Sequence, residues 1–429
     1  MISTSARKLA GRRAFLAGAG AATLAGTFGF PAIAQARPIP VGAVLPFSGG
    51  LELFGEQARI GLDLARAEIN ARGGILGRPV EILYRDSRTD PKTAAERARE
   101  LIQRDEAIAI AGEILSSSRE AMAPIMDGLK TPLLYATNYE GANDQGGGCG
   151  RYLFFFNTVP NQDTAPLIPW LNTQGKGNRY YMFGQNYVWP RNMFKAAKPM
   201  ITQVGGSVVA EEYTAGDEKD FVPVIRKIAD SGAQILLFAL PGAPGITFIK
   251  QAEEFGLLRR VTIAFLGFSE TYLGAFGEGK GENMVAGVPF VASDPDAGVR
   301  DFVTRVRAMH GANTGVSHYV FAHYNALMAL KGGIEKSGDV SREGAVNGMT
   351  GLTLATATGN MTITPDHHMA MYICIAMWWS ATPGREARGH RAPIGLPSLA
   401  RIFPRISAML GAPRDAHGAA PCVRAPMPV

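Results

Sequence analysis

Short apolar runs alternate with amphipathic stretches along the chain from Ile39 onward. The first four apolar runs are nearly continuous, without polar residues at alternate positions: 41–45, 80–84, 108–111 and 132–136. Such runs predict strands of a parallel sheet that is covered on both faces. Residues 56–70 between the first two runs carry an apolar stripe at helical spacing, and Gly73-Gly74 is expected to end that helix.

A further helix start follows the second predicted strand at Asp90-Pro91. Aspartate offers a side-chain acceptor at the cap position, and proline suits the first helical position because no partner is needed there for its missing N–H. Strands and helices that alternate at this spacing predict βαβ units with right-handed crossovers.

The same rhythm restarts after the glycine-rich segment 146–148. Strands are expected at 179–183, 207–212, 234–240 and 261–266, with helices near 163–173, 189–204, 221–231 and 245–255. Two longer helices, 299–310 and 317–335, are expected to pack on an existing lobe, because no clear series of strands follows them. The pattern therefore predicts two doubly wound, Rossmann-like α/β lobes, and small ligands commonly bind between two such domains.

The N-terminal 36 residues have the layout of an export signal. A basic head is followed by the uncharged stretch 14–30 and then by the small residues of Ala34-Gln-Ala36. The pair Arg12-Arg13, followed by Ala-Phe-Leu, resembles the twin-arginine type of signal. We expect export, with cleavage near Ala36.

The C-terminal segment 377–429 differs in composition from the body. It holds seven arginines, no lysine, eight prolines and only two acidic residues. We interpret this tail as an out-of-frame translation or an unrelated extension. The whole chain has a formal net charge of +6, but the body between leader and tail has 32 basic and 35 acidic residues. A nucleic-acid partner is therefore not expected.

A family resemblance is carried by residues 61–80, Gly-Leu-Asp-Leu-Ala-Arg-Ala-Glu-Ile-Asn-Ala-Arg-Gly-Gly-Ile-Leu-Gly-Arg-Pro-Val, followed by Asp86 and Asp90-Pro91. This segment resembles the extracellular solute-binding proteins of the branched-chain amino acid type, and the resemblance extends over 39–376. It implies the type I periplasmic binding fold, with 37–156 and 292–355 in one lobe and 157–291 and 356–376 in the other.

A second set of motifs resembles the amide- and urea-binding branch of that family. The motifs are Tyr139-Glu140-Gly141, Pro160-Asn-Gln162 and the segment 184–191, Gly-Gln-Asn-Tyr-Val-Trp-Pro-Arg. In that branch a Ser-Asp pair usually stands where this chain has Gln185 and Asn186. The resemblance implies capture of urea or a short-chain amide, with an amino acid as the alternative ligand.

The resemblance also implies a set of site residues. The ligand-binding candidates are Ser116, Tyr135, Thr137, Tyr187, Trp189, Ser269 and Glu270. Ser116 offers a hydroxyl and a backbone N–H at a helix start, and Tyr135 and Thr137 stand where a parallel strand ends. The residues expected in the hinge or at the pocket rim are Tyr139, Glu140 and Gly141.

The sequence favours a binding protein over an enzyme. It contains no Gly-x-Ser-x-Gly nucleophile motif and no Cys-x-x-Cys, and the isolated Cys149 and Cys374 leave open whether they pair. No cofactor or metal is expected. The resemblance implies a periplasmic location and, as partners, an inner-membrane ABC permease with its ATPase subunits. An amide hydrolase and a cytoplasmic amide sensor are the less favoured alternatives.

Overall fold

The computed structural model describes residues 37–141, 150–276, 283–367, 369–370 and 374–378. The predicted leader, its cleavage site near Ala36 and the tail beyond residue 378 lie outside the described residues. Cys149 lies outside them too, and so does the side chain of Cys374, so the pairing of these cysteines stays open.

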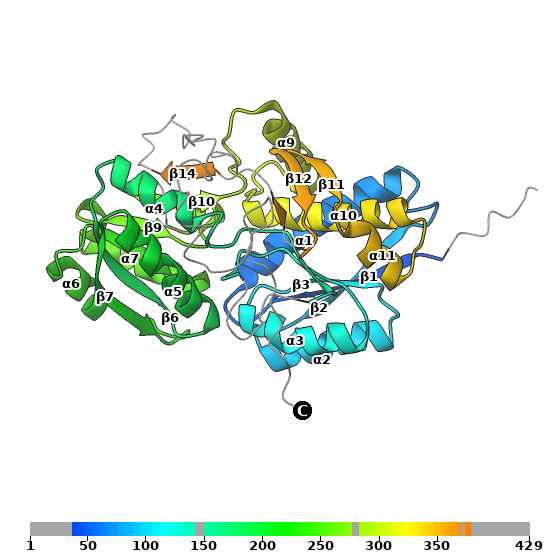
Figure 1. The fold of residues 1–429 in the computed structure, drawn as a ribbon, viewed down its shortest axis with the longest axis horizontal. Coiled ribbons are helices and arrows are strands. Elements are labelled where there is room, and N and C mark those ends of the chain that lie inside the picture. The colour runs from blue at the N-terminus through cyan, green and yellow to red at the C-terminus, as the bar shows by residue number, and fades with distance from the viewer. Residues whose placement is uncertain (1–36, 142–149, 277–282, 368, 371–373, 379–429) are drawn as a thin grey trace, which may run out of the picture. The chain divides into compact units, whose positions relative to one another are not determined.

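The first lobe is built on a five-stranded parallel sheet in the order β2-β1-β3-β4-β5 (Figure 1). Its strands are β1 Ile39–Leu45, β2 Val80–Asp86, β3 Ala109–Gly112, β4 Leu133–Tyr135 and β5 Leu153–Phe155. Helices α2 (Pro91–Gln103) and α3 (Ser116–Gly128) cover one face, and α1 (Glu52–Ala71) lies on the other. The four predicted strands are confirmed to within two residues at each end, and α3 begins at Ser116, where a helix start was expected, whereas β5 was not predicted.

Local signals in the sequence set the ends of these elements. The carboxylate of Asp90 accepts the backbone N–H of Thr93 at 2.7 Å and caps α2, with Pro91 as its first residue. After α1 the chain turns through Gly73 and Gly74, whose φ values are 93° and 80°. The predicted start of α2 and end of α1 are confirmed.

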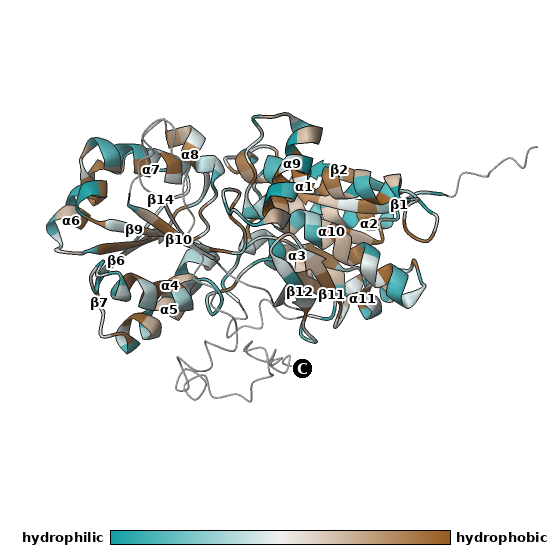
Figure 2. Ribbon diagram, turned by 90° about the horizontal axis from the view of Figure 1, so that it is seen from above, coloured by the Kyte–Doolittle hydropathy of each residue, from teal (hydrophilic) through white to brown (hydrophobic). Residues whose placement is uncertain are grey.

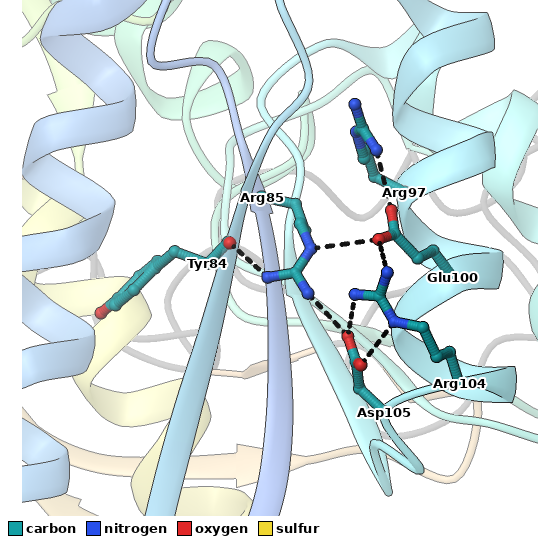
Figure 3. A network of polar contacts seen from close by, with 6 residues as sticks. All are labelled: Tyr84, Arg85, Arg97, Glu100, Arg104 and Asp105. Carbon is teal, nitrogen blue, oxygen red and sulfur yellow. Dashed lines mark hydrogen bonds and ion pairs between the residues drawn. The ribbon is translucent and has the colours of Figure 1, made fainter.

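A polar network joins β2 to the helix that follows it (Figure 3). The guanidinium of Arg85 on β2 contacts the carboxylate of Asp105 at 2.7 Å and that of Glu100 on α2 at 3.7 Å. Arg97 and Arg104 approach the same carboxylates from the helix side. These partly exposed ion pairs connect the edge strand β2 to the C-terminal end of α2.

The second lobe repeats the winding of the first. Its sheet has the order β14-β10-β9-β8-β6-β7, in which only the edge strand β14 is antiparallel to its neighbour. Its strands are β6 Arg179–Gln185, β7 Ser207–Thr214, β8 Ile235–Ala239, β9 Thr262–Phe265, β10 Met284–Val288 and β14 Cys374–Trp378. The predicted fold class, two doubly wound α/β lobes, is confirmed.

Helices cover both faces of the second sheet (Figure 2). Helices α4 (Thr164–Thr173) and α5 (Val188–Gln203) lie on one face, and α6 (Val222–Asp230), α7 (Gly242–Glu254) and α8 (Thr271–Phe276) lie on the other. A 3₁₀ turn, Leu257–Arg259, leads into β9. Apolar residues occupy the strands and the inward helix faces, and polar residues face outward.

Three helices that follow β10 return to the first lobe. They are α9 (Ala297–His310), α10 (His318–Ser337) and α11 (Arg342–Met349). Helix α10 packs tightly on α1, because Gly61 has no side chain: a Cβ there would lie 2.2 Å from the carbonyl oxygen of Val320. The two longer predicted helices thus pack on an existing lobe, as expected. None of the described helices is long and apolar enough to cross a membrane.

The C-terminal part of the described chain departs from the expected organisation. Strands β11 (Thr353–Thr356), β12 (Gly359–Ile363) and β13 (Met369–Ala370) form a separate small antiparallel sheet, which the sequence pattern did not predict. The N–H of Phe155 on β5 donates to the carbonyl of His367 at 2.9 Å, so the segment expected to close the second lobe from residue 356 begins beside the first. Strand β14 includes Met377 and Trp378 and pairs with β10, so the expected tail boundary at 377 falls inside a strand.

Candidate functional site

The two sheets share one winding order, and this order places a candidate site at their strand ends. In the first lobe the connections leave β1 and β3 in opposite directions, and in the second lobe the same holds for β6 and β8. Ligands of open α/β sheets bind beyond the carboxyl ends of strands at such a switch point. The relevant loops are 46–51 and 113–115 in the first lobe and 186–187 and 240–241 in the second.

A buried ionic network lies at the start of α3. Ser116 donates its hydroxyl to Oε2 of Glu140 at 2.7 Å, and Nη2 of Arg119 contacts Oε1 of the same carboxylate at 2.7 Å. The side chain of Arg119 is 1% exposed and that of Glu140 is fully buried. Burial by itself lowers the pKa of Arg119, but Glu140, Tyr135 and Tyr139 together raise it above its ordinary value. The two charges therefore neutralise one another.

Aromatic rings surround this ion pair. The Arg119 guanidinium carbon lies 5.3 Å from the ring centre of Tyr135 and 4.9 Å from that of Tyr139. The Tyr139 ring stacks on Phe155 with a centroid separation of 4.5 Å. Cations are attracted to aromatic faces at such distances, so the two tyrosines help to hold the buried guanidinium.

The hydroxyl groups of the other predicted residues of the first lobe donate hydrogen bonds to backbone carbonyls of the same lobe. The Tyr135 hydroxyl donates to the carbonyl of Ile114 at 2.9 Å, and Thr137 donates to the carbonyl of Glu113 at 3.2 Å. Both bonds fasten the end of β4 to the loop that follows β3. Burial raises the pKa of Tyr135, so its hydroxyl stays neutral.

Glu113, which the sequence pattern did not single out, organises that loop. Its buried carboxylate accepts from the hydroxyl of Ser87 at 2.5 Å and from the backbone N–H groups of Ile114 and Leu115, both at 2.7 Å. Burial raises the pKa of this carboxyl group, and the hydrogen bonds act in the opposite direction. The loops after β2 and β3 are thereby held together beside the start of α3.

Two aromatic side chains of the second lobe lie at the site. Tyr187 caps α5 and is half-buried, and the Trp189 side chain on its first turn is 4% exposed. Their ring centres lie 6.3 Å apart. Burial raises the pKa of the Tyr187 hydroxyl, and the nearby Tyr135 and Glu140 of the first lobe raise it further. Residues of both lobes thus share one electrostatic environment.

The last two predicted residues, Ser269 and Glu270, form their hydrogen bonds outside the network around Arg119. The fully buried Ser269 lies with its Oγ 2.6 Å from the hydroxyl of Thr271. The Glu270 carboxylate accepts the backbone N–H of Ala292 at 2.9 Å, in the chain that leaves β10 for the first lobe. Burial raises the pKa of Glu270 to about 8. This loop is attached to the crossing chain and not to the ionic network around Arg119.

The same loop is bound to α10, which in turn is bound to the chain that follows β5. The Nε2 of His318 lies 2.8 Å from the carbonyl oxygen of Phe268, and its Nδ1 lies 3.2 Å from the side-chain amide of Asn157. A carbonyl can only accept, so His318 donates through Nε2 and accepts from Asn157 through Nδ1. Burial lowers the pKa of His318 to about 4, which keeps the ring neutral. His318 therefore connects a segment of each lobe through its two ring nitrogens.

The loops of the two lobes also touch directly. The N–H of Ala243 on α7 points to the carbonyl oxygen of Gly50 at 3.5 Å. A Cβ at Gly242 would lie 2.7 Å from that same oxygen. Phe54 of α1 packs edge-on against Tyr319 and Tyr272, with ring centroids 4.8 Å and 5.8 Å away. The switch-point loops of the two lobes are thus in contact.

Comparison with known proteins identifies the family. The model of a family described as periplasmic binding protein matches residues 38–382, which include both lobes and the candidate site. This chain belongs to that family. Proteins of this family bind substrates and are not enzymes.

The relatives of this periplasmic binding protein are distant. It is 23% identical over 332 residues to the leucine-, isoleucine-, valine-, threonine- and alanine-binding protein of Pseudomonas aeruginosa, covering 76% of this chain and 86% of the relative. It is 26% identical over 228 residues to an amino acid binding protein of the same species, covering 52% of this chain and 59% of that relative.

A solved structure agrees in fold. The solute-binding protein of an ABC transporter from R. palustris, in complex with 4-hydroxybenzoate, superposes with a TM-score of 0.73 at 22% identity. The match covers 83% of this chain and 96% of the other. At this identity the likeness shows the fold alone.

The periplasmic binding protein brings together only part of the predicted site. Ser116, Tyr135, Tyr139 and Glu140 belong to one network around Arg119, and Tyr187 is close to it. Ser269 and Glu270 belong instead to the loop that holds the crossing chain. Gly141 turns the chain with a φ of 81° beside Val159.

Sequence reasoning missed Arg119, Glu113 and Asn138. A signal for Arg119 was present, because it follows Ser116 by one helical turn and so shares its face.

Proposed function

We propose that this periplasmic binding protein captures a small neutral solute for an ABC importer, with urea or a short-chain amide as the favoured ligand. The residues proposed to contact the ligand are Ser116, Tyr135, Thr137, Tyr187 and Trp189. A membrane permease and its ATPase subunits would receive the loaded protein. Ser269 and Glu270, also predicted to bind the ligand, are now proposed to support the hinge.

The single observation that carries this proposal is the internal pairing of the charged groups at the site. Arg119 and Glu140 bind each other at 2.7 Å. Glu270 is bound by the backbone of Ala292, and its pKa of about 8 keeps it mostly protonated at neutral pH. A zwitterionic amino acid would bring an ammonium and a carboxylate, and burying each without an opposite charge is costly. A neutral amide brings neither charge.

The neutral groups at the site suit a planar polar ligand. Tyr187 contributes a hydroxyl that burial keeps protonated, and Trp189 contributes a buried indole N–H. Amides and urea offer one carbonyl acceptor and several N–H donors in a plane, so they can stack between aromatic rings while they use such groups.

An amino acid is the second candidate. Two relatives carry amino-acid-binding names, and Arg119 and Glu140 are of the right charges to face a ligand carboxylate and ammonium. This alternative requires the Arg119–Glu140 pair to separate when the ligand enters.

A panel of ligands tests the proposal. Purified protein is titrated by calorimetry with urea, acetamide, propionamide, leucine and valine, and thermal unfolding is followed with each ligand. A ligand at a hundred times its Kd should add about 2.7 kcal/mol to the free energy of unfolding. Tight binding of leucine or valine without any response to urea and amides would replace the favoured ligand class by the second candidate.

A substitution of Tyr187 sharpens the test. Tyr187→Phe removes one hydroxyl and keeps the ring, so amide binding should weaken about tenfold, because a lost hydrogen bond in a buried site costs about 1–3 kcal/mol. Tyr213→Phe on β7 is the matched control, because its hydroxyl is bound by Glu211 instead. Ammonia release from the same amides would point to a hydrolase.

Export is part of the proposal. The leader 1–36 is proposed to direct the folded protein to the periplasm by the twin-arginine route, with cleavage near Ala36. Replacing Arg12 and Arg13 by Lys should leave precursor in the cytoplasm, as judged by fractionation and mass. Normal maturation of the double variant would indicate the general secretory route.

A further inference from the structure

Asn138 lies two residues before the buried Glu140, and its side-chain amide has a defined orientation. Its Oδ1 accepts the hydroxyl of Tyr319 on α10 at 2.9 Å. Since a hydroxyl donates to the amide oxygen, the Nδ2 group is the one directed away from Tyr319. Asn138 is 5% exposed, so its two amide protons need an acceptor within the protein or on a ligand.

The Nδ2 group faces Gly267 in the loop after β9. An ideal Cβ built on Gly267 would lie 3.4 Å from Nδ2 of Asn138. The same Cβ would lie 3.1 Å from Cη2 and 3.3 Å from Cζ2 of Trp189. The missing side chain of Gly267 therefore lets an amide of the first lobe and an indole of the second approach the same point of the backbone.

The indole N–H of Trp189 is a second donor at this place. The nitrogen Nε1 is two bonds from Cζ2 in the ring, and it is buried without a hydrogen-bond partner among the described residues. A buried donor without an acceptor is unfavourable, and this one belongs to a side chain that is 4% exposed.

We propose that Asn138 and Trp189 form an oxygen-recognising subsite beside Gly267, in which a neutral ligand carbonyl accepts from both lobes. The inference rests on the proposed function, because it assigns a part of the same site. The chemistry is that of a neutral acceptor, since the two groups only donate and the nearby guanidinium of Arg119 is already paired with Glu140. Tyr319 acts as a positioning residue that fixes the amide of Asn138.

An acceptor held in this way would also favour lobe closure. Asn138 belongs to the chain after β4 in the first lobe, and Trp189 belongs to α5 in the second. A ligand oxygen that accepts from both is satisfied only while the two lobes are in contact, so it biases the population towards the closed form.

The decisive variant is Asn138→Asp, which keeps the size and the acceptor for Tyr319 but replaces the donor by a second acceptor. Binding of urea or acetamide should weaken at least tenfold by calorimetry. Trp189→Phe removes the indole N–H from the other lobe and should weaken binding to a similar extent. Asn360→Asp, on the exposed strand β12, is the matched control and should leave the affinity unchanged.

The ratio of urea to thiourea affinity separates a ligand contact from a structural effect. Sulfur is a poorer acceptor than oxygen, so the wild-type protein should prefer urea, and Asn138→Asp and Trp189→Phe should reduce the preference. Tyr319→Phe should reduce it too, because the amide of Asn138 is then free to turn. A purely structural loss would weaken both ligands equally and leave the ratio unchanged, which overturns the subsite.

The same measurements distinguish this subsite from the proposed ligand class. If the wild-type protein binds leucine and ignores urea and amides, the proposed ligand class fails. The subsite is then judged with leucine as the probe: an unchanged affinity in Asn138→Asp and Trp189→Phe overturns it, and a tenfold loss supports an oxygen-binding subsite but overturns its assignment to a neutral carbonyl. If Asn138→Asp does not fold by circular dichroism, Trp189→Phe decides.

Discussion

The guanidinium of Arg119 and the carboxylate of Glu140 meet at 2.7 Å with both side chains removed from solvent. The pair joins the first turn of α3 to the chain that follows β4. Ser116 completes the carboxylate's hydrogen bonding, and Tyr135 and Tyr139 face the guanidinium. Charges buried in this manner are costly to separate, and the pair therefore makes a direct prediction about stability.

Replacing Arg119 by Met should lower the free energy of unfolding by about 3–5 kcal/mol, because the Glu140 carboxylate is left buried without its counter-ion. Denaturation by guanidinium chloride measures this loss. Arg104→Met is the matched control: Arg104 at the end of α2 is 59% exposed beside Asp105 and should contribute far less to stability. Equal losses in the two variants would contradict the buried role of Arg119.

Glu270 should make the stability of the protein depend on pH. Its folded pKa of about 8 lies above its ordinary value of 4.5, so the folded state retains a proton that the unfolded chain releases between these values. The free energy of unfolding should therefore fall as pH rises from about 4.5 to about 8. Glu270→Gln keeps an acceptor for Ala292 and should remove this contribution.

The comparison between wild type and Glu270→Gln isolates the effect of this one group. Asp163, whose pKa burial raises to about 6, contributes a fall of the same sign at lower pH, but it is present in both proteins. The difference between the two unfolding free energies should change between pH 5 and pH 8. A constant difference over that range would show that Glu270 titrates normally.

Gly242→Ala should interfere with contact between the lobes. The new Cβ would lie 2.7 Å from the Gly50 carbonyl oxygen and from Cδ2 of Leu51, both in the first lobe. We expect at least tenfold weaker ligand binding by calorimetry and a larger radius of gyration by small-angle scattering with ligand present.

A second glycine controls for backbone strain. Gly338, at the end of α10, has a φ of 69° against 73° for Gly242, but a Cβ there meets nothing within 4 Å. Both alanine variants should lose roughly 1 kcal/mol of stability from the left-handed conformation, and only Gly242→Ala should lose affinity. Equal affinity in both would remove Gly242 from the closing contact.

Leu76→Asn should stabilise the protein. Ile75 and Arg78 exchange backbone hydrogen bonds of 2.8 Å and 3.0 Å around Leu76 and Gly77, whose φ values are 48° and 78°. A two-residue turn with two positive φ angles prefers Asn-Gly, and Leu76 is 48% exposed. We expect a gain of about 0.5–1 kcal/mol in denaturation by guanidinium chloride.

The control for this gain is Phe255→Asn. Phe255 is equally exposed at 48%, but its φ of −86° is ordinary for any residue. It should gain nothing from the substitution. A gain of the same size there would mean that removing exposed apolar surface, and not relief of the turn, accounts for the effect.

The periodicity of the chain was enough to predict the eight principal strands and both lobes. Six of those strands are short runs of mostly buried residues, and the edge strands β2 and β7 are partly buried, so each gives a local signal that does not depend on distant residues. The strands that were not predicted are β5, β10, β11, β12, β13 and β14. They are short, with five residues or fewer, and β5, β10 and β14 pair with strands that lie far from them or beyond a loop in the sequence.

The sequence by itself also indicated Ser116, Tyr135, Glu140 and Tyr187, because they follow strand ends and carry the resemblance to the family. Only the tertiary structure decided what these side chains contact. Whether Glu140 faces a ligand or a protein cation depends on Arg119, and whether Glu270 faces the site depends on the chain that leaves β10. Asn138 and Gly267 are 129 positions apart in sequence. No local pattern predicts their close approach, because it exists only where the two lobes meet.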